Sequence, residues 1–239
     1  MLADLQETPP RSRIGKRWAD DEIEVVAARV DVTLEAVRAS AALLSKEERQ
    51  RAARFAFDRD RHRFVVARGR LRQLLAERLD VEPESVEFDY GARGKPRLSR
   101  RFVGADLRFN VSHSGDVVAY AFSRGRDIGI DVERVRVIRD TDDIAARFFS
   151  RCENEAYLAL DRRDRLIGFF NCWTRKEAFI KALGEGVHHP LDSFDVTLAP
   201  GEPARILRAG DTPGDDCRWA LSSFDSEPGF VGAVVVEKP

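Results

Sequence analysis

The chain has 239 residues, of which 43% are hydrophobic and 34% are charged, and its formal net charge is −1. This length suits one large domain or two small ones with a real core, and this composition excludes a chain that is disordered throughout. A net charge so near zero argues against a simple polyanion binder. Between Arg49 and Arg72, however, nine arginines stand against two aspartates. Such an excess attracts phosphates or acidic partners, or it forms a solvated, salt-bridged helix face.

The sequence gives no sign of export or of membrane insertion. Residues 1–20 are polar around Pro9 and Pro10 and predict a loose leader without the apolar core of a signal peptide. No later stretch approaches the ~20 apolar residues of a membrane span. The three cysteines (Cys152, Cys172 and Cys217) are odd in number and lack metal-ligand spacing, which favours reduced thiols. We therefore expect a cytoplasmic protein that does not bind a membrane.

The first half of the chain is predicted to mix helices and strands. Ser45 and Glu48 have the spacing of a capping box, in which each side chain bonds the backbone of the other residue at the start of a helix. Apolar periodicity and turn residues predict, in chain order, a strand over 22–31, helices over 33–42, 45–57 and from about 60 to Pro83, a turn cluster at 91–96, and strands over 107–112 and 117–122. A tight turn over 112–116 is expected between the last two strands.

The second half repeats this order of elements. The patterns predict a strand over 128–135, helices over 140–149, 153–161 and 166–183, and closing strands over 191–198, 219–224 and 229–236. Each half thus has a strand, then helices, then strands. This order permits two similar α+β lobes.

Asp131 and Glu133 are the first candidate functional residues. Side chains alternate along a strand, so the two carboxylates share one face while Val132 points into packing. Paired carboxylates ionise readily only if they are exposed or share a cation, and oxygen ligands suit Mg²⁺. The alternative is a surface strand with two solvated acids.

The helix over 166–183 carries the second candidate group. Trp173, Glu177 and Lys181 are four residues apart and share one face, so Glu177 can complete a metal site and Lys181 can steady phosphate charge. The alternative is a surface Glu–Lys pair, which stabilises a helix by only ~0.2–0.5 kcal/mol. The neighbouring Phe179 and Ile180 weaken that alternative, because they predict that Glu177 is partly buried.

Lys95, Ser112 and His113 form a third group of phosphate-binding residue types. A lone histidine at a strand end can equally be structural.

Five stretches together resemble a known family, the phosphopantetheinyl transferases of the type that activates surfactin synthetase. They are residues 94–96 (GKP), 109–115 (FNVSHSG), 128–133 (IGIDVE), 147–150 (RFFS) with Glu153, and 173–181 (WTRKEAFIK). The resemblance spans about residues 45–194. Each stretch alone is a weak signal, whereas the combination around Asp131 and Glu177 is specific.

The resemblance implies a fold and a ligand set. The fold would be an α+β pseudo-dimer of two similar lobes, residues 1–126 and 127–239, in a monomeric protein with coenzyme A bound in the cleft between the lobes. Asp131, Glu133 and Glu177 would hold Mg²⁺, or Mn²⁺ in its place, against the diphosphate.

The resemblance also implies roles for basic residues. Lys176 and Lys181 would contact phosphate, with Lys181 stabilising the leaving group. Lys95 and His113 match positions that grip the nucleotide phosphates, and Ser112 lies in the same phosphate-binding turn. Arg51 and Arg63 fall where the family places contacts to the 3′-phosphate. Glu48 departs from the pattern, because some relatives have a basic residue near this position. This departure leaves the 3′-phosphate contacts open among Arg49, Arg51, Arg54 and Arg63.

The implied reaction is attack by the serine of an acyl, peptidyl or aryl carrier protein on the β-phosphate of coenzyme A. Such carriers serve fatty-acid, polyketide or nonribosomal-peptide biosynthesis, and residues 149–183 are expected to form part of their docking platform. The base that takes the serine proton is left open among Glu177, a water at the metal and Glu153.

Three other functions were weighed against this one. They are a magnesium-dependent phosphohydrolase of nucleotide diphosphates, a coenzyme A-binding module without catalysis, and a nucleic-acid binder. The low net charge and the lack of an aromatic stacking pattern disfavour the nucleic-acid binder.

Overall fold

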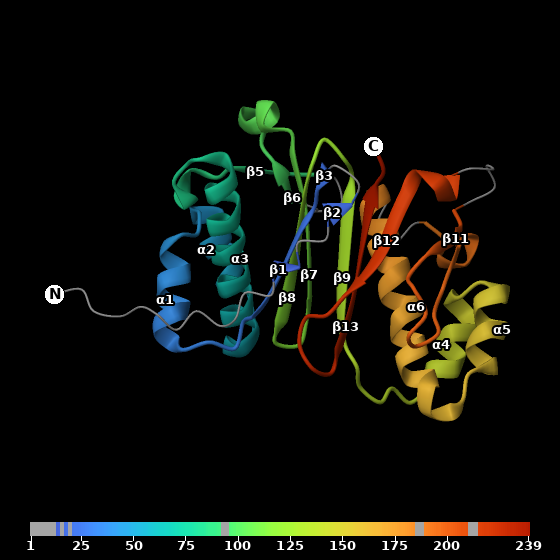
Figure 1. Ribbon diagram of the computed structural model, residues 1–239. Helices are drawn as coiled ribbons and strands as arrows, with labels where there is room; N and C mark the ends of the chain where they lie inside the picture. Colours follow the sequence, from blue (N-terminus) through green and yellow to red (C-terminus); the bar gives the residue numbers. More distant parts are fainter. Residues whose placement is uncertain (1–12, 15–16, 19–20, 92–95, 185–188, 210–214) are drawn as a thin grey trace. The chain divides into compact units, whose positions relative to one another are not determined.

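The computed structural model describes residues 13–14, 17–18, 21–91, 96–184, 189–209 and 215–239 (Figure 1). Contacts divide the described residues into two compact units, one within residues 28–107 and the other within residues 13–27 and 108–239. The segment 108–126 therefore groups with the C-terminal half in this division. The lobe boundary between residues 126 and 127 stays a prediction.

The unit of residues 28–107 is built mainly from helices. Its elements are α1 (Leu34–Ala42), α2 (Lys46–Ala52), α3 (Asp58–Leu79), η1 (Pro83–Ser85), β5 (Phe88–Tyr90), β6 (Pro96–Leu98) and η2 (Arg100–Ala105). Helix α1 packs against α3, and β5 pairs with β6 in an antiparallel hairpin.

The capping box predicted for α2 is confirmed. The Glu48 N–H donates to Ser45 Oγ (3.2 Å), and the Ser45 N–H donates to Glu48 Oε2 (2.9 Å). Glu48 is buried and also accepts from Arg72 Nε at 2.6 Å. The acid that departs from the family pattern therefore has a structural role. The helix ends at Ala52, five residues before the predicted end at 57.

The second unit contains two main sheets. One has the order β1 (Arg13–Ile14), β4 (Glu24–Arg29), β8 (Val117–Arg124), β7 (Leu107–Ser114). The other is antiparallel, with the order β12 (Trp219–Phe224), β13 (Phe230–Glu237), β9 (Ile128–Arg134). Two small pairs, β2 (Arg17–Trp18) with β3 (Asp21–Glu22) and β10 (Asp195–Val196) with β11 (Ile206–Arg208), complete the strands, and η4 (Leu191–Ser193) and η5 (Asp215–Arg218) are short 3₁₀ helices.

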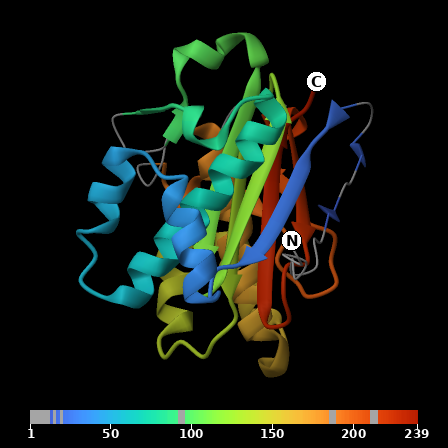
Figure 2. The same cartoon turned by 90° about the vertical axis from the view of Figure 1, so that its left-hand side faces the viewer.

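The β9–β13–β12 sheet has apolar contacts on both faces. Helix α6 (Arg162–Leu183) lies against one face, and α4 (Thr141–Phe148) and α5 (Arg151–Ala159) pack on α6 (Figure 1). On the other face, Ile130 and Val132 share a core with Val117 and Ala119 of β8. Strands β8, β9 and β13 accordingly run side by side in Figure 2. Because side chains alternate, the face of β9 opposite Ile130 and Val132 is turned toward α6.

Gly129 sets how closely α6 approaches β9. A Cβ atom at this position would lie 2.1 Å from the carbonyl oxygen of Ala178 and 2.3 Å from the backbone nitrogen of Ala182. Both are backbone atoms of α6, so a larger residue would have to displace the helix. Glycine here lets α6 present its side chains directly to the middle of β9.

Several predictions can now be judged. The α+β class is confirmed. The turn predicted over 112–116 is present but shorter, because β7 continues through Ser114 and the chain turns at Gly115 (φ +57°) and Asp116. The predicted strand 191–198 is shorter, since η4 precedes β10. Cys152, Cys172 and Cys217 form no disulfide within the described part of the chain. Within the described ranges, no helix combines the length and the apolar character that a membrane crossing requires.

Candidate functional site

Asp131 is the centre of a polar cluster in the second unit. It lies in the middle of β9 and is only 4% exposed. Its Oδ1 atom accepts from Lys181 Nζ of α6 (2.6 Å) and from Ser112 Oγ of β7 (2.7 Å), and Lys181 Nζ also donates to Ser112 Oγ (3.2 Å). Three elements that are distant in sequence thus meet at one carboxylate. Its other oxygen, Oδ2, is buried and has no hydrogen-bond partner among the described residues.

Glu133 lies two residues further along β9 and is half-buried. Its Oε2 atom accepts a hydrogen bond from Ser114 Oγ at 2.6 Å, and Arg136 Nη1 lies 3.7 Å from the same oxygen. The carboxylate is therefore held toward β7 rather than extended into solvent.

Glu177 interacts electrostatically with these two acids. It precedes Lys181 by one turn of α6 and is half-buried. Burial raises the pKa of Glu177, the Lys181 ammonium opposes this rise, and the charges of Asp131 and Glu133 add to it. The three carboxylates that we predicted as metal ligands therefore act on one another, with Lys181 balancing part of their charge.

The three carboxylates are of the type that binds Mg²⁺, but their side chains do not converge on one point as they would around a bound ion. No group of three or more His, Cys, Asp or Glu side chains within the described ranges is placed to hold a metal ion. The donors are nevertheless all carboxylate oxygens, which Mg²⁺ prefers, and the buried Asp131 Oδ2 lacks a partner. A buried carboxylate oxygen without a donor is costly unless a cation or hydrogen bond satisfies it. The donor set therefore fits the ion.

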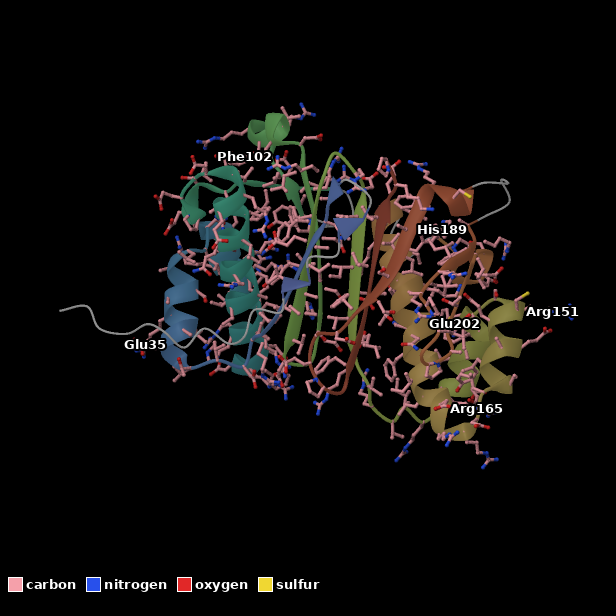
Figure 3. The ribbon with its side chains drawn as sticks, viewed as in Figure 1. Glu35, Phe102, Arg151, Arg165, His189 and Glu202 are labelled. Atoms are coloured by element: carbon pink, nitrogen blue, oxygen red, sulfur yellow. The ribbon has the colours of Figure 1, made fainter. Side chains whose placement is uncertain are left out.

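Glu153 and Lys176 occupy a different place from the one we predicted. Lys176 Nζ lies 2.7 Å from Glu153 Oε2, with the two side chains only 1% and 2% exposed. Both side chains also bond backbone groups: Lys176 Nζ donates to the carbonyls of Leu191 and Phe194 (2.7 Å each), and Glu153 accepts from the N–H groups of Ser150 and Val196 (2.8 Å each). By contrast, Arg151 points outward from the same end of α5 (Figure 3).

This geometry makes the Glu153–Lys176 pair a structural tie. The three protons of the ammonium group already have three acceptors, so Lys176 cannot reach a bound phosphate without breaking the pair. Glu153 is equally engaged. Burial raises its pKa, and the Lys176 ammonium opposes that rise. The roles predicted for the two residues, a phosphate contact and a base, are therefore left out of the mechanism below.

The other described residues that were predicted to bind phosphate are not among the groups that bond Asp131. His113 is exposed and, by strand alternation, lies on the face of β7 opposite Ser112. In the other unit, the guanidinium group of Arg51 lies 5.3 Å from the centre of the Phe64 ring, and Arg63 Nη1 donates to Asp60 at 3.3 Å. Lys95 lies outside the described residues.

Ser114 and His189 are two polar side chains to which the sequence assigned no role. Sequence reasoning missed Ser114, although the alternation of Ser112 and Ser114 was readable once 107–114 is recognised as one strand. His189, to which we had given no role, lies with its Nε2 atom 3.1 Å from Ser193 Oγ, near the C-terminal end of α6 (Figure 3).

Comparison with known proteins places the chain in a family. Residues 127–235 match the profile of the 4′-phosphopantetheinyl transferase superfamily, and residues 32–124 match that of the N-terminal part of 4′-phosphopantetheinyl transferases. The 4′-phosphopantetheinyl transferase HetI of Nostoc sp. is 38% identical over 216 residues, which cover 90% of this chain and 88% of HetI. Sfp, the 4′-phosphopantetheinyl transferase of Bacillus subtilis, is 32% identical over 196 residues, covering 82% of this chain and 83% of Sfp.

A relative from a different kind of organism agrees. A phosphopantetheinyl transferase of Thraustochytrium sp. is 30% identical over 196 residues, covering 77% of this chain and 67% of the relative. The chain belongs to the 4′-phosphopantetheinyl transferase superfamily. The resemblance that we identified from five short stretches is thereby confirmed.

Proposed function

We propose that this protein transfers the 4′-phosphopantetheine group of coenzyme A to a serine of an acyl, peptidyl or aryl carrier protein, and that the transfer depends on Mg²⁺. The observation that carries the proposal is the meeting of Asp131 with Lys181, beside a Glu177 whose pKa is raised by burial and by two neighbouring acids. A cluster of acids with one lysine suits a diphosphate that brings its own cation. Membership of the superfamily supports the transfer itself.

The transfer breaks a phosphoanhydride bond of coenzyme A and forms a phosphoester bond to the carrier serine. The serine oxygen of the carrier forms a bond to the β-phosphorus of coenzyme A, and the bond from that phosphorus to the bridging oxygen breaks. Adenosine 3′,5′-bisphosphate leaves with the electron pair of the bridging oxygen, and the serine proton passes to a base. Enzymes promote such reactions mainly by positioning and by neutralising charge.

The residues of the site divide these tasks. Asp131, Glu133 and Glu177 would hold Mg²⁺, which when bound neutralises charge on the diphosphate. Lys181 would stabilise charge on the leaving oxygen. Its bond to Asp131, one of the acids that would hold the cation, supports this role. Glu177 is our choice of base. Glu153, the other candidate side chain, is engaged in its pair with Lys176, whereas burial raises the pKa of Glu177, which favours acceptance of a proton.

Mass spectrometry of an apo carrier protein tests the proposal. The carrier should gain the mass of one phosphopantetheine group when incubated with the protein, coenzyme A and Mg²⁺. Asp131→Ala should lower the rate at least about 100-fold, because it removes a ligand and a partner of Lys181 at once. Glu35→Ala, which changes an exposed acid in the first turn of α1, outside the expected docking platform, is the matched control and should transfer at the normal rate.

Other outcomes would point to other functions. Release of the nucleotide without modification of the carrier would indicate a phosphohydrolase, and binding of coenzyme A without turnover would indicate a binding module. A mass gain that persists in EDTA would remove the metal from the mechanism. Several expectations stay predictions. They are the cytoplasmic location inferred from the sequence, the pseudo-dimer with coenzyme A between its lobes, the monomeric state, the use of Mn²⁺ and the roles of Lys95, Ser112, His113, Arg51 and Arg63.

A further inference from the structure

One edge of β9 is bonded by side chains instead of by a neighbouring backbone. Strand β13 pairs with β9 along the opposite edge. On the outer edge, alternate backbone N–H groups of β9 donate to alternate side chains of β7: Ile130 to Asn110 Oδ1 (3.0 Å), Val132 to Ser112 Oγ (3.4 Å) and Arg134 to Ser114 Oγ (3.1 Å). Three polar side chains at two-residue spacing thus replace the carbonyls of a normal ladder.

Two of these three side chains also bind an acid. Ser112 Oγ donates to Asp131 Oδ1 (2.7 Å), and Ser114 Oγ donates to Glu133 Oε2 (2.6 Å). In each case the serine accepts from the N–H of the residue that follows the acid. A hydroxyl group has one proton, and an N–H donor that occupies its lone-pair side leaves that proton to point at the carboxylate.

The serines therefore fix which carboxylate oxygen is available. Ser112 occupies Oδ1 of Asp131 and leaves the buried Oδ2 without a partner among the described residues. Ser114 occupies Oε2 of Glu133 in the same way. Groups that orient the ligands of a metal commonly affect metal affinity by about 10–100-fold without touching the ion.

We infer that Ser114 is a positioning residue for Glu133, as Ser112 is for Asp131, and that the two hydroxyl groups orient both carboxylates toward one divalent cation. This inference rests on the proposed function, since it assigns the cation to these acids. Ser114 is the cleaner residue to test, because Ser112 Oγ also accepts from Lys181.

Asn110 provides a matched control from the same row of side chains. It is buried and its Oδ1 atom accepts from the Ile130 N–H of β9, as the serines accept from β9, and this bond involves no acid. Asn110→Ala and Ser114→Ala each remove one acceptor from β9, but only Ser114→Ala also removes the donor to a carboxylate. Ser114→Thr keeps the hydroxyl group.

The experiment measures the Mg²⁺ dependence of the full chain in two ways. The first readout is the rate of carrier modification at increasing Mg²⁺, and the second is the shift of Tm with Mg²⁺ in the presence of coenzyme A and without a carrier. Ser114→Ala should raise the half-saturating Mg²⁺ concentration about tenfold in both, with the maximal rate recovering toward wild type at high Mg²⁺. Ser114→Thr should restore the half-saturating Mg²⁺ concentration of the wild type. Asn110→Ala should lower Tm but leave the half-saturating Mg²⁺ concentration unchanged.

The inference would be overturned if Ser114→Ala and wild type had the same half-saturating Mg²⁺ concentration. It would also be overturned if Ser114→Ala and Asn110→Ala raised that concentration equally, because Ser114 would then have a purely structural role. A wild-type protein that modifies its carrier in EDTA would also overturn it, while leaving the transferase proposal intact. If instead no carrier is modified but the Tm shifts behave as expected, the positioning role holds and the proposed reaction fails.

Discussion

Lys176 and Glu153 form an ion pair that is almost completely enclosed, with its atoms 2.7 Å apart. The pair joins α6 to α5, and its backbone bonds extend to the segment 191–196. The ammonium group also lies 4.0 Å from the centre of the Phe194 ring, where the negative face of the ring favours a cation. Two residues that the family resemblance assigns to catalysis thus hold together the part of the fold that carries Glu177 and Lys181.

The first prediction follows from this burial. Lys176→Met should lower the free energy of unfolding by about 3–5 kcal/mol, because it leaves Glu153 buried without its partner. Urea denaturation followed by circular dichroism measures the loss. The double variant Glu153→Gln/Lys176→Met should recover part of it, since it leaves no unpaired charge inside. If Lys176→Met were as stable as wild type yet failed to modify a carrier, Lys176 would instead be the phosphate contact implied by the resemblance.

Local periodicity made part of the site readable from the sequence. The two-residue repeat of a strand put Asp131 and Glu133 on one face, and the four-residue spacing of a helix put Glu177 and Lys181 one turn apart. Both are confirmed by the strand β9 and the helix α6. That this strand lies against this helix could not be derived from periodicity, because it depends on contacts between distant segments. The resemblance to a family supplied that step.

The errors have physical causes as well. The run of small polar residues from Ser112 to Asp116 has the composition of a turn, yet β7 continues through Ser114 because both hydroxyl groups bond across to β9. Tertiary contacts override local preference in such a strand. Ser150 and Glu153 have the same spacing as Ser45 and Glu48, so a capping box could have been read there, and the structure contains one. No local sequence pattern, however, predicts that Glu153 is buried against Lys176.

The second prediction concerns the close approach of α6 to β9. Gly129→Ala should destabilise the protein by about 1–3 kcal/mol, because the new Cβ atom meets backbone atoms of α6 that must shift as a unit. The same shift would move Glu177 and Lys181 away from Asp131, and a displacement of about 1 Å can cost about 100-fold in rate. The rate should therefore fall even at temperatures where the variant is fully folded.

Gly104→Ala is the control for this substitution. A Cβ atom at Gly104 meets no atom within 4 Å, so the change should leave both stability and rate close to wild type. Measurements of Tm and of carrier modification on the two variants compare a crowded glycine with an open one. A fully active Gly129→Ala protein would show that the spacing of α6 and β9 does not control the site.

The third prediction is a pH-dependent gain of stability on removal of a site carboxylate. The pKa of Glu177 is raised above its ordinary value of 4.5, first by burial and further by Asp131 and Glu133, against the opposing Lys181. As the pH rises above 4.5, the unfolded chain loses this proton before the folded protein does. The folded protein binds more protons in that window, so its stability falls as the pH rises. Glu177→Gln, which cannot ionise, escapes this loss.

Thermal unfolding in the absence of divalent metal tests whether loss of the Glu177 carboxylate stabilises or destabilises the protein at high pH. Glu177→Gln should have a higher Tm than wild type at pH 8, and the difference should shrink as the pH is lowered toward the ordinary pKa of a glutamate, because Glu177 of the folded wild type then takes up its proton. Glu155→Gln, on the exposed surface of α5, should show no such trend. The same Glu177→Gln protein should modify carriers at least about 100-fold more slowly, because it has lost a ligand and a base. A variant less stable than wild type at pH 8 would mean that Lys181 outweighs burial, and that the acids are already balanced without a cation.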